Sequence, residues 1–275
     1  MRSFIRHFIT FPVHKVDLNI ILGQIVSMGE VELMEVYDSE FYADMEISSV
    51  TSAREIIPLL INRYQPISVV DVGCGTGAFA REFIQNGVED VTGYEGEWMR
   101  GTETLLQKDK YIYVDFANEI SATRTYDMCL CLEVAEHLDH SAARTLVATL
   151  TNLSTKVVFS AAIPRQGGNH HVNEQWPEFW AQLFAEKGYF LEWDPRISIW
   201  NNSNIASCYR QNLLIFQKTA DRGLIIPLSL VHPEAWELAM KYRTTPIWLK
   251  AFHLLPRSFL RFGKKLLYRI VGKIR

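Results

Sequence analysis

The chain has 275 residues and a mass of 31.7 kDa, which is long for one domain and short for two, since domains usually hold about 100 to 200 residues. Hydrophobic residues make up 48% and charged residues 21%, an ordinary globular composition that argues against a disordered or low-complexity protein. The net charge is −3, but ten of the 28 basic residues follow Glu237, where no acidic residue occurs. The rest of the chain therefore has 18 basic against 31 acidic residues, a balance that disfavours a general nucleic-acid binder.

Short β-branched runs alternate with helical stretches from about residue 50, a pattern typical of a parallel sheet covered on both faces. The expected strands are 67–72, 90–94, 111–114, 126–131, 155–161, 189–193 and 212–217. The expected helices are 49–64, 77–86, 98–108, 141–153 and 177–187. We therefore predict an N-terminal extension or lid at 1–48, a central domain at 49–219 and a basic C-terminal segment at 220–275.

Several classes of protein are not expected from this sequence. No stretch reaches the roughly 18 uninterrupted apolar residues of a membrane-spanning helix, and no cleavage site follows the basic, apolar N-terminus. The four cysteines form no CxxC pair and are too few for a disulfide framework. A reducing, cytoplasmic location fits this cysteine usage.

The most informative segment is VVDVGCGTG, residues 69–77. An apolar strand runs into Asp71 and then into a glycine-dense turn that opens a helix. Glycines let the backbone approach a ligand closely, and the N-terminus of the helix favours electronegative groups. The spacing is GxGxG after an acid, whereas the dinucleotide fingerprint is GxGxxG without that acid. An acid here would repel a pyrophosphate but could accept hydrogen bonds from an ammonium group.

Three later strands also end in acidic residues, in the runs VTGYE (91–95), VDF (114–116) and LEVAEHL (132–138). With these four motifs in order, residues 67–217 resemble the class I S-adenosylmethionine-dependent methyltransferases. The resemblance implies a Rossmann-like α/β fold, with a seven-stranded, mostly parallel sheet whose last strand is antiparallel, and S-adenosylmethionine as cofactor. The seven strands expected from the pattern agree with it.

The resemblance also assigns roles to single residues. The methionine part of the cofactor would be held by Asp71, Gly73, Gly75 and Gly77, the ribose by Glu95, and the adenine by Asp115 and Phe116. Glu133 would lie beneath the cofactor. Trp98 could cover the adenine or pack into the core, and we interpret His137 as structural.

The polar segment 162–180 follows the fifth strand, where such sheets bind their ligands. Neutral histidine suits proton abstraction near pH 7, so we predict His171 as general base, with His170 as second choice. In the alternative, His171 or Asn173 only caps the next helix and pins the loop. The run HVNEQW resembles bacterial methyltransferases associated with surface carbohydrates. No metal site is predicted, because Glu174 and Asp194 lack a recognisable ligand spacing.

These features predict methyl transfer to a hydroxyl of a small molecule or glycan. A nicotinamide-dependent oxidoreductase and a non-catalytic, membrane-associated protein with the same fold are the alternatives. Residues 257–275 place apolar and basic side chains on opposite halves of a helical wheel. This appended amphipathic helix is predicted to lie on an anionic membrane surface, or else to dock on the acidic body or a second subunit.

Overall fold

The computed structural model describes residues 39–116, 118, 120, 124–220 and 226–244, and the side chains from 47 to 240 within them. The chain divides into two compact units, 1–43 and 44–275. The second unit contains the sheet and the candidate site. The amphipathic segment predicted at 257–275 lies outside the described residues. Within them, no helix has the length and apolar character needed to cross a membrane.

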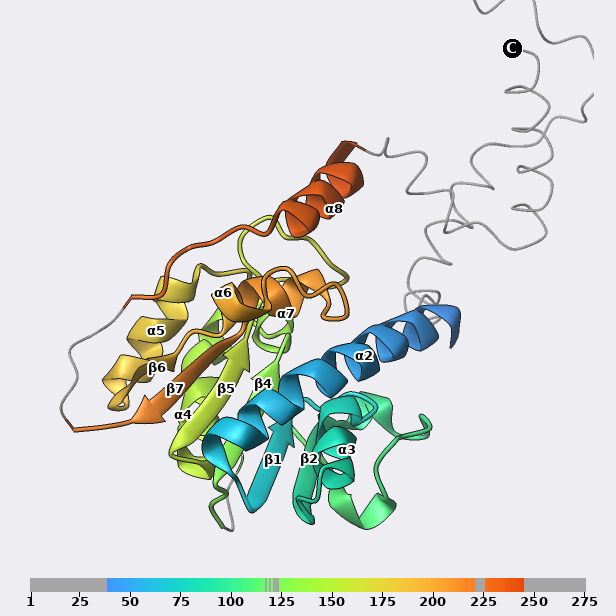
Figure 1. The fold of residues 1–275 in the computed structure, drawn as a ribbon, viewed down its shortest axis with the longest axis vertical. Coiled ribbons are helices and arrows are strands. Elements are labelled where there is room, and N and C mark those ends of the chain that lie inside the picture. Colours follow the sequence, from blue (N-terminus) through green and yellow to red (C-terminus); the bar gives the residue numbers. More distant parts are fainter. Residues whose placement is uncertain (1–38, 117, 119, 121–123, 221–225, 245–275) are drawn as a thin grey trace, which may run out of the picture. The chain divides into compact units, whose positions relative to one another are not determined.

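A seven-stranded sheet forms the centre of the second unit, in the order β3-β2-β1-β4-β5-β7-β6 (Figure 1). The strands are β1 (Ser68–Val72), β2 (Asp90–Gly96), β3 (Tyr111–Val114), β4 (Met128–Leu132), β5 (Lys156–Ser160), β6 (Tyr189–Trp193) and β7 (Leu214–Lys218). Strands β1 to β5 pair in parallel, and β7 runs antiparallel to both β5 and β6. The predicted α/β fold, with a mostly parallel sheet and an antiparallel last strand, is confirmed.

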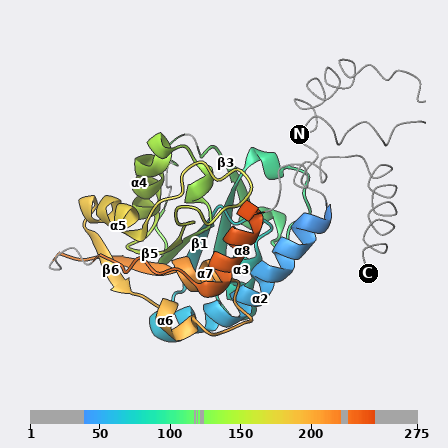
Figure 2. The same ribbon diagram turned by 90° about the horizontal axis from the view of Figure 1, so that it is seen from above.

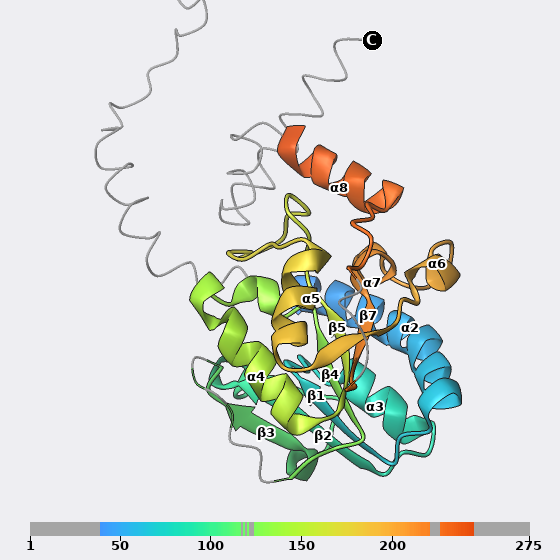
Figure 3. The ribbon, with the colours of Figure 1, turned by 90° about the vertical axis from the view of Figure 1, so that its left-hand side faces the viewer.

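Helices cover both faces of this sheet. The longer ones are α2 (Ser39–Tyr64), α3 (Ala78–Gln85), α4 (Ala143–Leu153), α5 (Pro177–Glu186) and α8 (Pro233–Thr244), and the short ones are α6 (Arg196–Ile199) and α7 (Ser207–Asn212). Figures 2 and 3 show α4 and α5 on one side of the strands and α2 and α3 on the other.

A hydrophobic core lies on each face of the sheet, and alternating strand residues belong to one core or the other, because successive side chains of a strand point to opposite faces. Val70 and Val72 join the core under α4 and α5, and Val69 joins the core under α2 and α3. The β-branched strand runs therefore bury both of their faces, as the continuous apolar pattern indicated.

One predicted helix, 98–108, is wrong. The structure has only two short 3-10 turns there, Glu97–Met99 and Lys108–Lys110. Between them Gly101 adopts a left-handed φ of 91°. The chain that follows brings Leu106 against the glycine loop, so that a Cβ on Gly77 would lie 2.6 Å from Cγ of Leu106. The tertiary position of this leucine thus outweighs the local helical spacing.

Candidate functional site

The four acids predicted from the strand ends come together at one edge of the sheet. Asp71 and Glu95 lie near the carboxyl ends of β1 and β2, while Asp115 and Glu133 directly follow β3 and β4. These strands are parallel neighbours in the order β3-β2-β1-β4, so their carboxyl ends meet at the same edge. In open α/β sheets this edge is where ligands bind.

The glycine loop turns sharply between β1 and α3. Gly73 N and Cys74 N both donate to Tyr94 O, at 2.8 and 3.1 Å, which ties the loop to β2. Gly75 has a left-handed φ of 56°, and a Cβ placed there would meet nothing within 4 Å. At Gly73, by contrast, a Cβ would lie 2.4 Å from Cγ2 of Val134. The loop is thus packed from below at Gly73 and open at Gly75, where a ligand could approach its backbone.

Asp71 and Glu95 lie beside this loop and are almost fully buried. Burial, and next the negative charge of Glu95, raise the pKa of Asp71 to about 7. Glu95 accepts hydrogen bonds from Gly75 N at 2.6 Å and Gly96 N at 2.7 Å, while burial raises its pKa. The predicted ribose ligand therefore also braces the glycine loop.

The residues predicted for the adenine follow β2 and β3. Phe116 is buried, and its ring lies 5.7 Å from that of Trp98 at an interplanar angle of 32°. Trp98 is 68% exposed and lies over Gly96, where a Cβ would be 2.2 Å from its ring. Asp115 is exposed and accepts a hydrogen bond from Asn118 Nδ2 at 3.0 Å. Trp98 is thus a surface side chain next to Phe116 and does not pack in the core.

A network of side-chain amides surrounds Glu133, which has a left-handed φ of 53°. Asn212 Nδ2 donates to its carboxylate at 3.1 Å, and Gln166 Nε2 at 3.3 Å. Gln211 extends the network by donating to Gln166 Oε1 at 2.7 Å. Gln166 lies in the predicted polar segment 162–180, but Asn212 and Gln211 could not be selected from sequence, because they follow Glu133 by almost 80 residues and meet this network only in the folded chain.

The two histidines predicted as bases lie in the loop between β5 and α5. His170 is exposed, whereas only 12% of the His171 side chain is accessible. His171 Nδ1 lies 3.2 Å from Glu174 Oε1, and the ring packs edge to face with that of His137 at 4.9 Å. The structure thus brings His171 next to His137, which we had interpreted as structural, and leaves the side chain of His170 at the surface.

Only half of the alternative interpretation holds. Capping is wrong, because Trp176 is the N-cap residue of α5 and no side chain caps this helix. Asn173 does pin the loop, as the alternative also predicted, since its backbone N donates to Glu136 O at 3.0 Å and its Nδ2 donates to Ala135 O at 3.4 Å. Val172 N also donates to Glu136 O, at 2.8 Å. These bonds hold His171 against the 3-10 turn Ala135–His137.

Beyond the amide network lies a cavity of about 480 Å³, within the size range of small-molecule sites. Gln166 and Gln211 line it on the side of Glu133. Its other walls are largely apolar and come from the loop after β5, from Trp176, and from Val231, Ala235, Trp236 and Ala239. The segment leading into α8 and α8 itself thus form one wall of the cavity. Figures 1 and 3 show α8 beyond the carboxyl ends of β4 and β5.

Two buried arginines attach this wall to the domain. Arg196 forms an ion pair with Asp194 and donates to Leu228 O at 2.8 Å. Arg210 forms an ion pair with Glu234 at the start of α8 and donates to Trp200 O at 3.3 Å. Truncating either arginine would leave buried polar groups without partners, so the wall is a fixed part of the domain.

Comparison with known proteins gives one family match. The family model described as a methyltransferase domain matches residues 49–211. No curated protein matches the chain in sequence.

Solved structures with a similar chain path have low sequence identity and TM-scores below 0.5. The magnesium protoporphyrin IX methyltransferase of Synechocystis PCC 6803 with bound SAM is 16% identical, with a TM-score of 0.47, over 76% of this chain and 100% of that one. The plantazolicin methyltransferase BpumL is 17% identical, with a TM-score of 0.47, over 74% and 99%. A putative O-methyltransferase of Nostoc punctiforme PCC 73102 is 16% identical, with a TM-score of 0.47, over 65% and 59%. Likenesses this weak say nothing about what this chain acts on.

Proposed function

The chain belongs to the methyltransferase domain family, as a class I S-adenosylmethionine-dependent enzyme, and on this premise we propose that it methylates a hydroxyl of a small molecule or glycan. The observation that carries the proposal is the meeting of the glycine loop, Asp71 and Glu95 at the sheet edge, with a partly open cavity beyond the amide network of Glu133. The family match favours methyl transfer over the nicotinamide-dependent alternative.

The residues at the glycine loop fit the cofactor. S-adenosylmethionine supplies a methyl group on a positively charged sulfur, together with an ammonium and a carboxylate. The open space at Gly75 admits a ligand against the loop backbone, and the buried Asp71 offers a carboxylate to the ammonium. Phe116 and the exposed Trp98 provide apolar surface for an adenine ring. We propose these residues, with Gly73, Gly77, Glu95 and Asp115, as the cofactor site.

The acceptor would bind in the cavity beyond Glu133. Its apolar walls favour a hydroxyl carried on an apolar scaffold over a bare sugar, because sugar hydroxyls would lose their hydrogen bonds there. Gln166 and Gln211 are the polar groups that could orient such a hydroxyl toward the cofactor. Alignment of the two reacting atoms is the main contribution that methyl transfer needs from the protein.

Two roles suit His171 in this reaction. It could accept the hydroxyl proton directly, as the sequence predicts, or it could help to bind a cation that makes the hydroxyl more acidic. If His171 is the general base, His171→Ala should lower the turnover rate by about 10²- to 10⁴-fold. The direct role requires that turnover be independent of any metal ion.

Calorimetric titration with S-adenosylmethionine and its demethylated product tests the cofactor site. Asp71→Asn and Glu95→Gln should each weaken binding by about 1 to 3 kcal/mol, the usual loss for a charged hydrogen bond. Glu97→Gln is the matched control, because Glu97 follows the same strand but is exposed and pairs with Arg100. Unchanged affinity in both site variants would refute the cofactor assignment.

Acceptor screening tests the substrate class. Hydroxylated compounds with apolar scaffolds and free sugars can be compared by product release and by the mass gain of one methyl group. Trp236→Ala and Trp176→Ala should lower kcat/KM for the preferred apolar acceptor and leave cofactor affinity unchanged. Preference for free sugars, with no effect of either tryptophan, would contradict the proposed binding of the acceptor in this cavity.

We further propose that the protein is cytoplasmic and that residues 257–275 attach it to anionic membrane surfaces, on the strength of their amphipathic pattern alone. Sedimentation with anionic vesicles should separate the full chain, bound at low salt, from a chain ending at Thr244, which keeps α8. If both forms stay in solution, the membrane proposal is wrong.

A further inference from the structure

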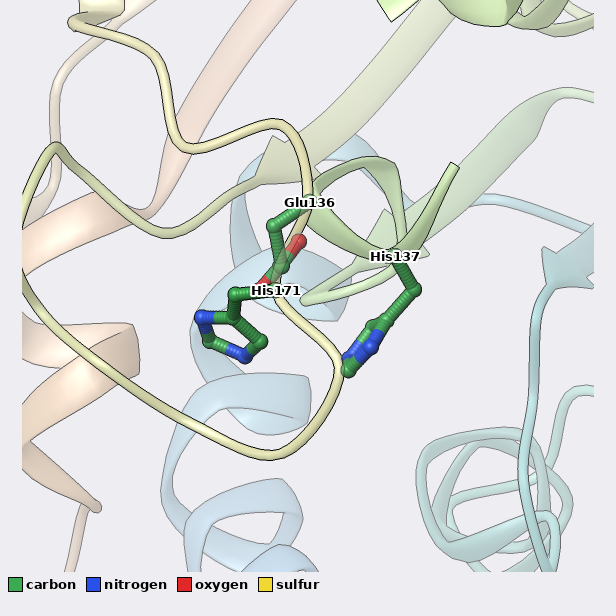
Figure 4. Close-up of side chains that lie close together, drawn as sticks. All are labelled: Glu136, His137 and His171. Atoms are coloured by element: carbon green, nitrogen blue, oxygen red, sulfur yellow. The ribbon is translucent and has the colours of Figure 1, made fainter. Parts of the chain in front are cut away.

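Three side chains near the amide network lie close enough to share one cation. Glu136 and His137 come from the 3-10 turn after β4, and His171 comes from the loop after β5 (Figure 4). One potential ligand atom from each lies within 4.8 Å of the others. Among the described residues this is the only group of at least three such side chains with that spacing.

Glu136 is a buried acid without a partner. Its side chain is fully buried, and neither carboxylate oxygen makes a hydrogen bond of good geometry to the described residues. The nearest polar neighbours of the carboxyl group are the backbone groups of Glu136 and Ala162 and the carboxyl group of Glu133. An unpaired buried carboxylate is costly, and a bound cation would remove that cost.

Glu133 lies close to Glu136 but supplies no positive charge. It is itself an acid, and its oxygens accept hydrogen bonds from the amides of Asn212 and Gln166. The positive charge that would complement Glu136 is therefore absent from this part of the described chain.

The two histidines have the surroundings of metal ligands. His171 Nδ1 lies 3.2 Å from Glu174 Oε1, and with the proton on Nδ1 the lone pair is on Nε2. Glu174 is itself held by Arg165 N at 2.6 Å and Gly167 N at 2.8 Å. A carboxylate behind a histidine is the usual arrangement that orients a metal-binding imidazole.

His137 is oriented in a similar way. Its ring hydrogen-bonds the backbone of His170. The side chain itself reaches the surface.

We propose that Glu136, His137 and His171 bind one divalent cation of the transition series. Two imidazole nitrogens with one carboxylate suit zinc, manganese or iron(II), and leave coordination positions for other ligands. Magnesium is disfavoured, because it prefers oxygen ligands.

In this arrangement His171 is a ligand of the cation and not the general base.

Metal binding can be measured without any acceptor. The full chain, freed of metal with a chelator, should bind cobalt(II) and zinc one to one, and cobalt should give a visible absorption band. Glu136→Gln, His137→Ala and His171→Ala should each weaken zinc binding by at least about 100-fold, and Glu174→Gln by about 10- to 100-fold. His170→Asn is the matched control, since it alters the adjacent exposed histidine and tolerates its left-handed φ of 57°.

Glu136→Gln gives a second signature, which is read from thermal melts. It should abolish the stabilisation that zinc gives to the wild type, because it removes the carboxylate that would pair with the cation. Folding of every variant is checked by circular dichroism.

The outcomes separate the two proposals. If S-adenosylmethionine binds but neither cobalt nor zinc binds the wild type one to one, the metal site is wrong and the proposed function stands. If the ligand variants bind zinc as tightly as the wild type, these residues are not its ligands, and the metal-site proposal is overturned. If zinc binds as proposed but S-adenosylmethionine does not, the proposed function fails and the metal site remains.

Discussion

The pH dependence of cofactor binding should report directly on Asp71. In the ligand-free protein, burial and the neighbouring Glu95 raise the pKa of Asp71 to about 7, so this side chain is about half protonated at neutral pH. An ammonium group bound beside it would favour the carboxylate and lower that pKa again. Binding should therefore displace a proton from Asp71 whenever the pH is below about 7.

The size of the effect follows from this pKa. If the pKa of Asp71 in the complex falls well below 6, the dissociation constant should be about eightfold higher at about pH 6 than at about pH 7.5. Proton release should fall from about 0.9 per bound cofactor at the lower pH to about 0.2 at the higher pH. The comparison ends near pH 7.5 because α-amino groups begin to lose their own proton at about pH 7.7 to 8.0.

Calorimetry in buffers with different ionisation enthalpies measures both quantities. The titratable groups that interact with the charge of Asp71 are Glu95, Cys74, Cys129, Cys131 and Tyr209, and burial raises the pKa of each. Asp71→Asn isolates the contribution of Asp71, because it keeps these neighbours and removes only the titrating carboxyl group. A wild-type affinity that is equal at both pH values, or an Asp71→Asn variant with the same pH dependence as the wild type, would refute this reasoning.

Three further outcomes are expected. Gly75→Ala should weaken binding of the demethylated cofactor and lower the free energy of unfolding by about 1 to 2 kcal/mol, because residue 75 has a left-handed conformation. Gly73→Ala should lower the melting temperature more than Gly75→Ala, because its Cβ would clash with Val134. Arg210→Met should speed hydrogen exchange in α8 but not in β1 or β4, because it breaks the tie between α7 and the start of α8. A carboxyl group whose pKa is raised on folding destabilises the native state as it ionises, so the wild type should lose stability between about pH 4 and 7. Asp71→Asn should reduce this loss and should be more stable than the wild type above about pH 7. Thermal melts of both ligand-free proteins across this pH range measure the difference.

The sheet and the cofactor side of the site could be predicted because their signals are local. Each strand is a short apolar run, and Asp71, Glu95, Asp115 and Glu133 directly mark the strand ends. Parallel strands align such ends at one edge, so the motifs alone were enough to place them. The resemblance to a known family added which part of the cofactor each motif is expected to bind.

The acceptor side could not be predicted in the same way, because it depends on contacts between distant parts of the chain. Gln211 reaches Gln166 because α7 leads into β7, which pairs with β5, the strand before the loop that holds Gln166. His137 meets His171 only because the loop between β5 and α5 hydrogen-bonds to Glu136 O. Glu136 was visible in the sequence as part of a motif, but its burial without a partner is a property of the packed core.

The wall formed by α8 has a consequence for how substrate choice could diverge within this protein's lineage. Ala235, Trp236 and Ala239 line the cavity, yet they lie after residue 211, where the match to the family domain ends. Arg196 and Arg210 fasten this added segment to the domain from outside the cofactor site. Exchange of the segment after β7 would therefore reshape the cavity while every residue assigned to the cofactor stays in place. The cavity is therefore built from two stretches of the chain, the loop after β5 with Gln211 inside the family domain and residues 231–239 beyond it, and the second stretch can change without altering the first.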